Sequence, residues 1–258
     1  MGHPALDLTS RTAVVIGGTS GIGLTLAKGL AQAGADVVAT GRRAALVESA
    51  AGEIRKLGRR SLAIASDVTS ESSLEGLLQS VVTEFGGVDI LINSAGSTKR
   101  AATLDVTLSE WNQILDTNLN GTLRACQIFG RHMIRKKYGR IVNVASLSSL
   151  VALYEVAAYS ASKAAVASLT KSLAVEWACH GICVNALVPG VFRTSMNSAL
   201  LDGTPRSEEF LLRTPMHRFG ELEELVGAAV FLSSEAASFV TGHLLAVDGG
   251  FLASGVNQ

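Results

Sequence analysis

The amino-acid sequence predicts an α/β fold, namely a doubly wound, seven-stranded parallel sheet with helices on both faces. Two observations predict it. Short, continuously apolar runs alternate with longer helical stretches along the chain, and strands that are buried on both faces have such runs. Strict alternation of strand and helix builds right-handed βαβ units, whose helices cover both faces of a parallel sheet.

Seven short runs are the expected strands, and six longer segments are the expected helices. In chain order, the strands are Thr12–Ile16, Asp36–Thr40, Ser61–Ala65, Val88–Asn93, Arg140–Ala145, Ile182–Val188 and Leu244–Val247. The helices are Ile22–Ala33, Ala44–Lys56, Glu71–Glu84, Leu108–Lys137, Ala157–Cys179 and Glu221–Ser233.

One long irregular region, Val191–Arg213, follows the dipeptide Pro189-Gly190. A loop of that length in a compact domain is usually a lid or a binding loop. No repeat, low-complexity tract or Pro/Gly-rich linker divides the sequence. We therefore expect one domain over residues 1–258, with a substrate lid around residues 191–213.

The composition excludes several classes of protein. The 258 residues include 22 basic and 22 acidic side chains, so the formal net charge is zero, whereas nucleic-acid-binding proteins normally carry a basic excess. Hydrophobic residues make up 48% of the chain, which is enough for a core and excludes general disorder. No uncharged apolar run approaches the ~20 residues that cross a membrane. We expect a cytoplasmic protein that binds neither nucleic acid nor membrane.

The three cysteines, Cys126, Cys179 and Cys183, indicate neither a disulfide framework nor a metal centre. They are too few and too scattered for a set of disulfides. Cys179 and Cys183 lie close together in the sequence, but His180 alone does not complete a zinc site. We expect buried or half-buried thiols and no bound metal.

A glycine-rich turn between the first strand and the first helix is the strongest local signal. A pyrophosphate must approach backbone N–H groups at a helix N-terminus, where a Cβ would collide. The spacing is G-x-x-x-G-x-G, and a cluster of glycines can also make a plain turn, but its place within a βαβ unit favours nucleotide binding. The candidate residues are Gly17, Thr19, Ser20, Gly21, Ile22 and Gly23.

The end of the second strand indicates which nucleotide is preferred. A site for NAD usually places Asp or Glu there to bind the ribose 2′-hydroxyl, whereas this chain has Arg42 and Arg43, and Asp36 lies at the opposite end of the strand. Two guanidiniums could bind a 2′-phosphate. The alternative is that both arginines only begin a surface helix. We expect NADP as cofactor, with NAD possible.

A tyrosine and a lysine lie four positions apart at the start of a long predicted helix. Tyr159 and Lys163 therefore share one helical face. Ser146 ends the fifth strand, where the carboxyl end of a strand meets the cleft. Asn118 lies within a predicted helix, where asparagine is locally unfavourable, so it is either exposed to solvent or functional. These four residues together are a far more specific sign of a catalytic site than any one of them alone.

These residues resemble the short-chain dehydrogenase/reductase family. The resemblance runs from Thr12 to Gly250 and includes Gly17-x-x-x-Gly21-x-Gly23, Asn93-Ser94-Ala95-Gly96, Asn118, Ser146, Tyr159-x-x-x-Lys163 and Pro189-Gly190. It implies a Rossmann fold and an NAD(P)-dependent oxidoreductase that interconverts a ketone and a secondary alcohol. The implied catalytic tetrad is Asn118, Ser146, Tyr159 and Lys163.

The resemblance also implies the remaining cofactor contacts. Asp67 would face the adenine, Val68 would also contact the cofactor, and Thr194 would hold the nicotinamide carboxamide. The other implied contacts are Asn93, Ala95, Gly96, Tyr159, Lys163, Pro189 and Gly190. Two residues depart from the family pattern, Ile16 before the first glycine and Ser94 after Asn93; both positions mainly support backbone geometry.

The chemistry of hydride transfer assigns roles to the tetrad. Charge that builds on a ketone oxygen needs a proton donor and a fixed hydrogen bond. Free tyrosine titrates near pH ~10, so the Lys163 cation, together with the oxidised nicotinamide, is expected to favour the Tyr159 phenolate for alcohol oxidation. Tyr159 would be the general acid or base, Ser146 would orient the carbonyl, and Asn118 would anchor a water that relays protons to Lys163.

The substrate is less well defined by the sequence. The lid mixes apolar and charged residues, which suits a small polar or sugar-acid-like carbonyl compound, and the chain resembles the bacterial sugar-acid dehydrogenase and 3-oxoacyl-thioester reductase branches. In a 3-oxoacyl-thioester (acyl carrier protein) reductase, the basic run Arg131–Arg140 would dock an acidic carrier; otherwise its cations favour a helix C-terminus. A third alternative is a non-catalytic nicotinamide-nucleotide-binding regulator, against which the intact tetrad argues.

The helix Ala157–Cys179 also bears on assembly. It carries small residues that permit close helix–helix approach, namely Ala161, Ala164, Ala165 and Ser168. The family resemblance makes this helix a subunit interface of a homotetramer or homodimer. Packing within one chain is the alternative.

Overall fold

The computed structural model describes residues 3–194, 201 and 203–257. Within these residues, six parallel strands form one sheet in the order β2-β1-β3-β4-β5-β6. They are β1 (Thr12–Ile16), β2 (Asp36–Thr40), β3 (Ile90–Asn93), β4 (Gly139–Val144), β5 (Ile182–Pro189) and β6 (Leu244–Val247). The predicted parallel α/β sheet is confirmed, but the prediction of seven strands is wrong.

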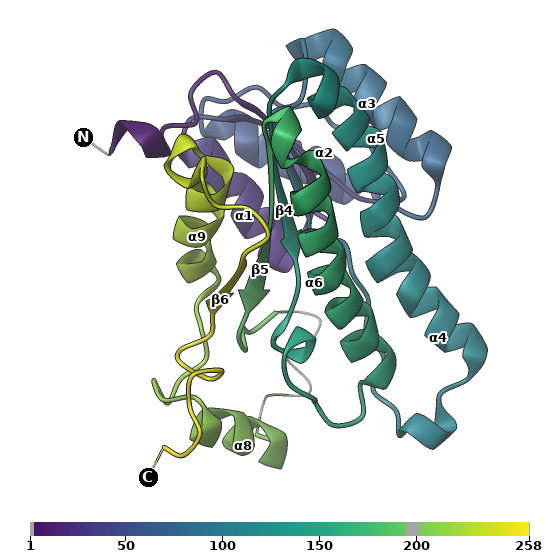
Figure 1. Ribbon diagram of the computed structural model, residues 1–258. Helices are drawn as coiled ribbons and strands as arrows, with labels where there is room; N and C mark the ends of the chain where they lie inside the picture. The colour runs from purple at the N-terminus through teal and green to yellow at the C-terminus, as the bar shows by residue number, and fades with distance from the viewer. Residues whose placement is uncertain (1–2, 195–200, 202, 258) are drawn as a thin grey trace.

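Helices cover both faces of the sheet (Figure 1). The helices α1 (Gly21–Gln32), α2 (Ala44–Lys56) and α9 (Val226–Ser233) pack on one face, and α3 (Glu71–Phe85), α5 (Gly121–Lys136) and α6 (Ala157–Trp177) pack on the other. Alternate β1 residues serve the two cores: Ala13 and Val15 face the first group, and Val14 and Ile16 face the second, as the two-residue period of a strand requires. None of the described helices combines the length and apolarity that a membrane crossing needs.

The expected strand Ser61–Ala65 runs beside β2 without forming a ladder with it. The Val37 amide donates to the Arg60 carbonyl at 3.1 Å, and the Ser66 amide donates to the Gly41 carbonyl at 3.0 Å. Between these two bonds, the Thr40 hydroxyl donates to the Ile64 carbonyl at 2.5 Å. Because a side chain supplies that intermediate bond, the segment covers the edge of the sheet without completing a seventh strand.

The long helix predicted over Leu108–Lys137 is interrupted. The chain forms α4 (Leu108–Leu115), a π-helical turn (Asp116–Asn120) and then α5. The Gly121 amide donates to the Asp116 carbonyl five residues earlier, and single π turns of this kind often lie at functional sites. The turn carries Asn118, which is completely buried.

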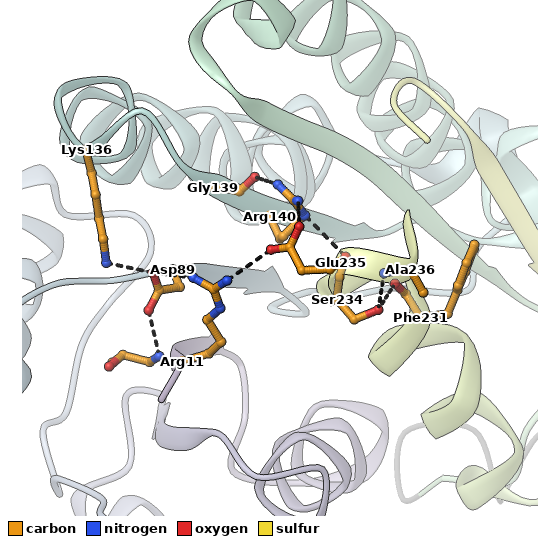
Figure 2. Close-up of polar contacts among 10 residues, drawn as sticks. Arg11, Asp89, Lys136, Gly139, Arg140, Phe231, Ser234, Glu235 and Ala236 are labelled. Carbon is orange, nitrogen blue, oxygen red and sulfur yellow. Dashed lines mark hydrogen bonds and ion pairs between the residues drawn. The ribbon is translucent and has the colours of Figure 1, made fainter. Parts of the chain in front are cut away.

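Buried charges join several elements at the amino ends of the strands. Asp89, which precedes β3, is 4% exposed and accepts the Lys136 amine at 2.6 Å and the Thr12 amide at 2.9 Å (Figure 2). Arg140 in β4 is also 4% exposed and pairs with Glu235 at 3.1 Å. Arg11 donates to the same Glu235 carboxylate at 3.0 Å. These pairs fix the N-terminal segment, β3, β4 and the turn after α9 together.

Tyr138 lies within this cluster. Its ring centre is 4.1 Å from the Arg11 guanidinium and 4.6 Å from the Arg140 guanidinium, within the range of cation–π attraction. Two cations of the predicted basic run are engaged in ion pairs: Arg140, which is buried, with Glu235, and Lys136, which is exposed, with the buried Asp89. They lie at the amino ends of the strands rather than forming an open basic patch.

Glu235→Ala should destabilise the fold because Arg140 would keep its buried charge without a carboxylate partner. We expect the free energy of unfolding, measured by urea titration, to fall by about 1–3 kcal/mol, the range for an unpaired buried polar group. Glu75→Ala, on the exposed side of α3, is the matched control and should stay within about 0.5 kcal/mol of the wild type. Equal stability of the two variants would contradict this role for Glu235.

Candidate active site

A cavity of about 700 Å³ lies at the carboxyl ends of the strands. Its walls include Ile16 from the end of β1, Ser94 after β3, Val144 from the end of β4 and Pro189 from the end of β5. Ligands of doubly wound sheets bind at this edge, where the strand order reverses. All the residues predicted from the sequence for catalysis or cofactor binding line the cavity, except Asn93 and Asn118.

The glycine-rich turn brings backbone close to backbone. A Cβ on Gly17 would lie 2.5 Å from the Ala95 nitrogen, and one on Gly23 would lie 2.1 Å from the Gly17 oxygen, so neither position accepts a side chain. Gly21 begins α1, and Ser20 at its N-cap makes no side-chain capping bond. The first amides of α1 therefore face the cavity without a serine cap, as an anion site at a helix N-terminus requires.

The two departures from the family motif do not disturb this turn. The Ser94 amide donates to the Ile16 carbonyl at 2.8 Å, which joins the ends of β3 and β1. Both partners are backbone atoms, so the contact does not depend on which side chains occupy the two positions.

Arg42 and Arg43 line the opposite part of the cavity, near the end of β2. Asp67 also lines it, and its pKa is lowered chiefly by the Thr69 amide bond, with a smaller contribution from the nearby Arg42 cation. Asp36 lies at the far end of β2 and pairs with Arg59 and Arg60 at 3.1 and 2.8 Å. The structure thus places two arginines where the sequence predicted them and keeps Asp36 away.

Lys163 reaches the cavity from α6 with its amine almost completely buried. The side chain is 5% exposed, and its Nζ donates to the Val144 carbonyl at 2.6 Å, at the end of β4. Burial lowers the pKa of Lys163 to about 8, because removal from water disfavours the cation. The nitrogen lies 5.9 Å from the Tyr159 ring centre.

Tyr159 and Ser146 meet in the same cavity. Burial raises the pKa of the Tyr159 phenol, and a hydrogen bond with the Ser146 side chain opposes that rise. The phenol is therefore protonated at neutral pH, which is the form a general acid needs. Ser146 is held in turn by the Ser148 amide, which donates to its hydroxyl oxygen at 3.2 Å.

Asn118 and Asn93 lie beneath the cavity rather than in its wall. The Asn118 Oδ1 accepts the Ser97 amide at 2.8 Å, and its Nδ2 donates to the Ser97 carbonyl at 2.9 Å and to the Ser162 hydroxyl at 3.0 Å. The Asn93 Nδ2 donates to the Asn143 side chain at 2.8 Å. The Asn93 side chain points into the core between the sheet and α5, so a contact of this residue with the cofactor, which stays a prediction, would come from its backbone.

Several wall residues were not singled out in the sequence, among them Ser66, Thr69, Thr117 and Phe192. Thr69 carried a usable signal: its amide and hydroxyl both donate to Asp67, at 2.9 and 2.8 Å, and Asp-x-Thr is a common turn sequence. Thr117 and Phe192 carried no sequence signal except that they lie next to Asn118 and near Gly190 in the chain.

The predicted lid is partly described. Residues 195–200 and 202 lie outside the described part of the chain, and α8 (Pro205–Arg213) forms its C-terminal half (Figure 1). The Arg206 guanidinium on α8 donates to the Tyr154 carbonyl at 3.0 Å. Next to Tyr154, the Glu155 carboxylate accepts the Arg100 guanidinium at 2.5 Å. The lid helix therefore contacts the segment that precedes α6, and that segment is joined in turn to the one that follows β3.

This chain is similar to known proteins along nearly its whole length. Residues 17–252 match the family profile described as Enoyl-(Acyl carrier protein) reductase. The chain is 42% identical over 255 residues to gluconate 5-dehydrogenase of Gluconobacter oxydans (strain 621H), covering 98% of this chain and 100% of that protein. It is 40% identical over 250 residues to 2-dehydro-3-deoxy-D-gluconate 5-dehydrogenase of Bacillus subtilis (strain 168), covering 97% and 98%.

A solved structure is also similar to this chain. The crystal structure of a gluconate 5-dehydrogenase from Burkholderia cenocepacia J2315, in complex with NADP and tartrate, has a TM-score of 0.94 and 38% sequence identity, covering 97% of this chain and 98% of that one. The family profile spans the glycine-rich turn, strands β2 to β6 and the helix that carries Tyr159 and Lys163. The chain belongs to the short-chain dehydrogenase/reductase family and is an oxidoreductase that acts on a CH–OH group.

Proposed function

We propose that this enzyme interconverts a sugar acid and its keto form with NADP, and that Tyr159 is the group that exchanges the proton. One observation carries the proposal: Tyr159, Lys163 and Ser146 line the same 700 Å³ cavity as the glycine-rich turn and Arg42. A reacting carbonyl and a nucleotide would therefore meet there. Relatives named for gluconate and for its 2-dehydro-3-deoxy derivative support this substrate class.

The residues present fit a phosphorylated dinucleotide. The amides at the start of α1 would bind the pyrophosphate, Arg42 and Arg43 would bind the 2′-phosphate, and Asp67 would face the adenine. When bound, NADP supplies or accepts the hydride at the substrate carbon. The Burkholderia cenocepacia enzyme was crystallised with NADP, which supports NADP over NAD for this chain.

The proton chemistry belongs to residues of this chain. In the direction of reduction, the Tyr159 phenol would donate its proton to the carbonyl oxygen, and Ser146 would hold that oxygen by a hydrogen bond. Below its pKa of about 8, the Lys163 cation would stabilise the phenolate that remains. Asn118, buried behind this group, would hold it in position rather than touch substrate.

Guanidiniums near the lid helix support an anionic substrate. Arg100 follows the cavity residue Gly96, Glu155 precedes α6, and Arg206 comes from the lid helix. Arg100 pairs with Glu155, and Arg206 lies close enough to Arg100 that this second cation contributes to lowering its pKa, after burial. The Glu155 and Glu209 carboxylates both lie near the Arg206 guanidinium, so the cluster carries charges of both signs. Its two guanidiniums are the groups that would pair with the carboxylate of a sugar acid.

The alternatives fit less well. A carrier protein that delivers a thioester must dock near the cavity, yet Lys136 and Arg140 of the basic run pair with Asp89 and Glu235 at the other end of the strands. A regulator without turnover has no need of a phenol and a buried amine in one nucleotide-sized cavity. No contact among the described residues specifically favours the carrier-protein reductase or the regulator.

Assembly and location also remain proposals. Ala164 and Ser168 on α6 are exposed, and Val175 on the same helix is 82% exposed, which supports the predicted helix–helix interface of a homotetramer or homodimer. The cytoplasmic location stays a prediction.

Tyr159→Phe should remove the proton donor and leave the fold intact. We expect turnover of gluconate or 5-ketogluconate with NADP(H) to fall by about 100-fold or more, the usual contribution of general acid–base catalysis, while the dissociation constant for NADP is unchanged. Steady-state kinetics and fluorescence titration measure the two quantities. Near-normal turnover in this variant would refute the proposed role of Tyr159.

Arg42→Ala should weaken NADP binding selectively. A charge-assisted bond contributes about 1.5–3 kcal/mol, so we expect the Michaelis constant for NADP to rise by about 10-fold to 100-fold with little change for NAD. Arg55→Ala, on the outer side of α2 and paired with Glu48, is the control. A wild type that prefers NAD, with a preference that Arg42→Ala does not alter, would overturn the assignment of NADP.

Lys163→Met should stabilise the protein and inactivate it. The unfolded chain binds the Lys163 proton more tightly, so the free energy of unfolding rises with pH between about 8 and 10.5 and is lowest below that window. Removing the buried cation should raise it by about 1–3 kcal/mol at neutral pH and abolish the slope. Urea titrations across this pH range measure both effects. Lys171→Met, at an exposed position of α6, is the control and should change neither the free energy of unfolding nor its slope with pH. A Lys163→Met protein that is less stable than the wild type would argue against a cost of burying the Lys163 cation.

A further inference from the structure

Ser162 is a buried hydroxyl beside the catalytic pair to which the proposed chemistry gives no role. It lies on α6 between Tyr159 and Lys163 and is completely buried. Its hydroxyl donates to the Tyr159 carbonyl at 2.7 Å and accepts the Asn118 Nδ2 at 3.0 Å. The hydroxyl therefore connects the backbone of Tyr159 to a side chain from another helix.

This arrangement is more than the usual behaviour of a helical serine. A serine within a helix often donates to a carbonyl one turn earlier, and Ser172 on the same helix does so, donating to the Ser168 carbonyl at 3.4 Å in an exposed position. Ser162 differs in having a second partner outside the helix. That partner, Asn118, belongs to the π-helical turn between α4 and α5.

Asn118 is itself held firmly. Both polar atoms of its side chain bond to the backbone of Ser97, at 2.8 and 2.9 Å, and the Thr122 hydroxyl donates to its carbonyl at 2.8 Å. Rotation of the amide would break bonds that are buried and cannot be replaced by water. Ser97 directly follows Gly96, which lines the cavity. One chain of hydrogen bonds thus runs from the cavity wall through Asn118 and Ser162 to the backbone of Tyr159.

We propose that Ser162 is a positioning residue, whose hydroxyl fixes the first turn of α6 against Asn118 so that the Tyr159 phenol stays in hydrogen-bond contact with Ser146. The inference rests on the proposed function, since it concerns the group that exchanges the proton. Ser162 itself touches neither substrate nor cofactor.

Loss of this hold has a definite chemical consequence. The Ser146 hydrogen bond opposes the rise that burial causes in the pKa of Tyr159. A phenol that moves away from Ser146 keeps its burial and loses that bond, so its pKa rises further. The charged groups of the cavity are Lys163 on the same helix and, along the cavity wall, Arg42, Arg43 and Asp67. Outside the cavity wall, Arg100, Glu155 and Arg206 form a cluster before α6 and on the lid helix. None of these groups is bonded to Ser162, and none changes in the variant.

The test compares Ser162→Ala with Ser162→Thr, which keeps the hydroxyl, and with Ser172→Ala, the matched control on the same helix. Oxidation of gluconate by NADP is followed across pH. For Ser162→Ala, we expect kcat to fall by about 10-fold to 100-fold, as small misplacements of reacting groups cause, and the rising limb of the pH profile to move to higher pH. The dissociation constant for NADP should stay at the wild-type value. The thermal midpoint should fall by about 2–4 °C, because the buried Asn118 Nδ2 loses one acceptor, and Ser172→Ala should match the wild type throughout.

Three results would overturn the inference while leaving the proposed function in place, provided that the wild type turns over and Tyr159→Phe does not. One is a wild-type kcat and pH profile in Ser162→Ala. Another is a loss of kcat with a lowered thermal midpoint and an unmoved profile, which is general destabilisation. The third is the same shifted profile in Ser162→Thr, because its hydroxyl is retained. Turnover by Tyr159→Phe equal to that of the wild type would overturn both proposals.

Discussion

The contact between the Lys163 amine and the Val144 carbonyl, 2.6 Å long, is the interaction on which the site depends. It joins α6 to the carboxyl end of β4, and Tyr159 lies one turn earlier on the same face of that helix. The Ser149 hydroxyl reinforces the join by donating to the Lys163 carbonyl at 2.8 Å. Burying a cation with one carbonyl partner is costly, and the lowered pKa of Lys163 records that cost.

The two ends of the sheet are built on opposite principles. At the amino ends, Asp89 and Arg140 are buried, hydrogen-bonded and paired with Lys136 and Glu235, so this end of the protein is closed by complementary charge. At the carboxyl ends, the absence of side chains on Gly17 and Gly23 lets backbone approach backbone and leaves helix amides facing a cavity. The stabilising charge pairs and the open site are thus separated by the length of the strands.

Much of this architecture could be predicted from local pattern. The predicted bounds of β1, β2 and β6 match the structure, because a short apolar run between turn residues has few other ways to bury itself. Ser61–Ala65 has the same pattern but lies beyond the edge strand, where a Thr40 hydroxyl bond to Ile64 replaces a ladder bond. The interruption at Asn118 also escapes local pattern, since α4 and α5 together have the composition of one continuous helix.

The site divides in the same way. The sequence alone determined the family, the order of the strands and helices along the chain, and the residue types that chemistry requires, because spacing along a helix and position at a strand end place Tyr159, Lys163, Ser146 and the glycine-rich turn at one edge. Only the tertiary structure decided which polar side chains face the cavity and which hold it from behind. The sequence does not show whether the polar side chains of Asn118, Asn93 and Ser162 face the cavity. Their roles depend on hydrogen-bond partners from distant segments, such as Ser97 and Asn143. A buried amide or hydroxyl must find its hydrogen bonds wherever the packed core offers them, and that choice is made in three dimensions.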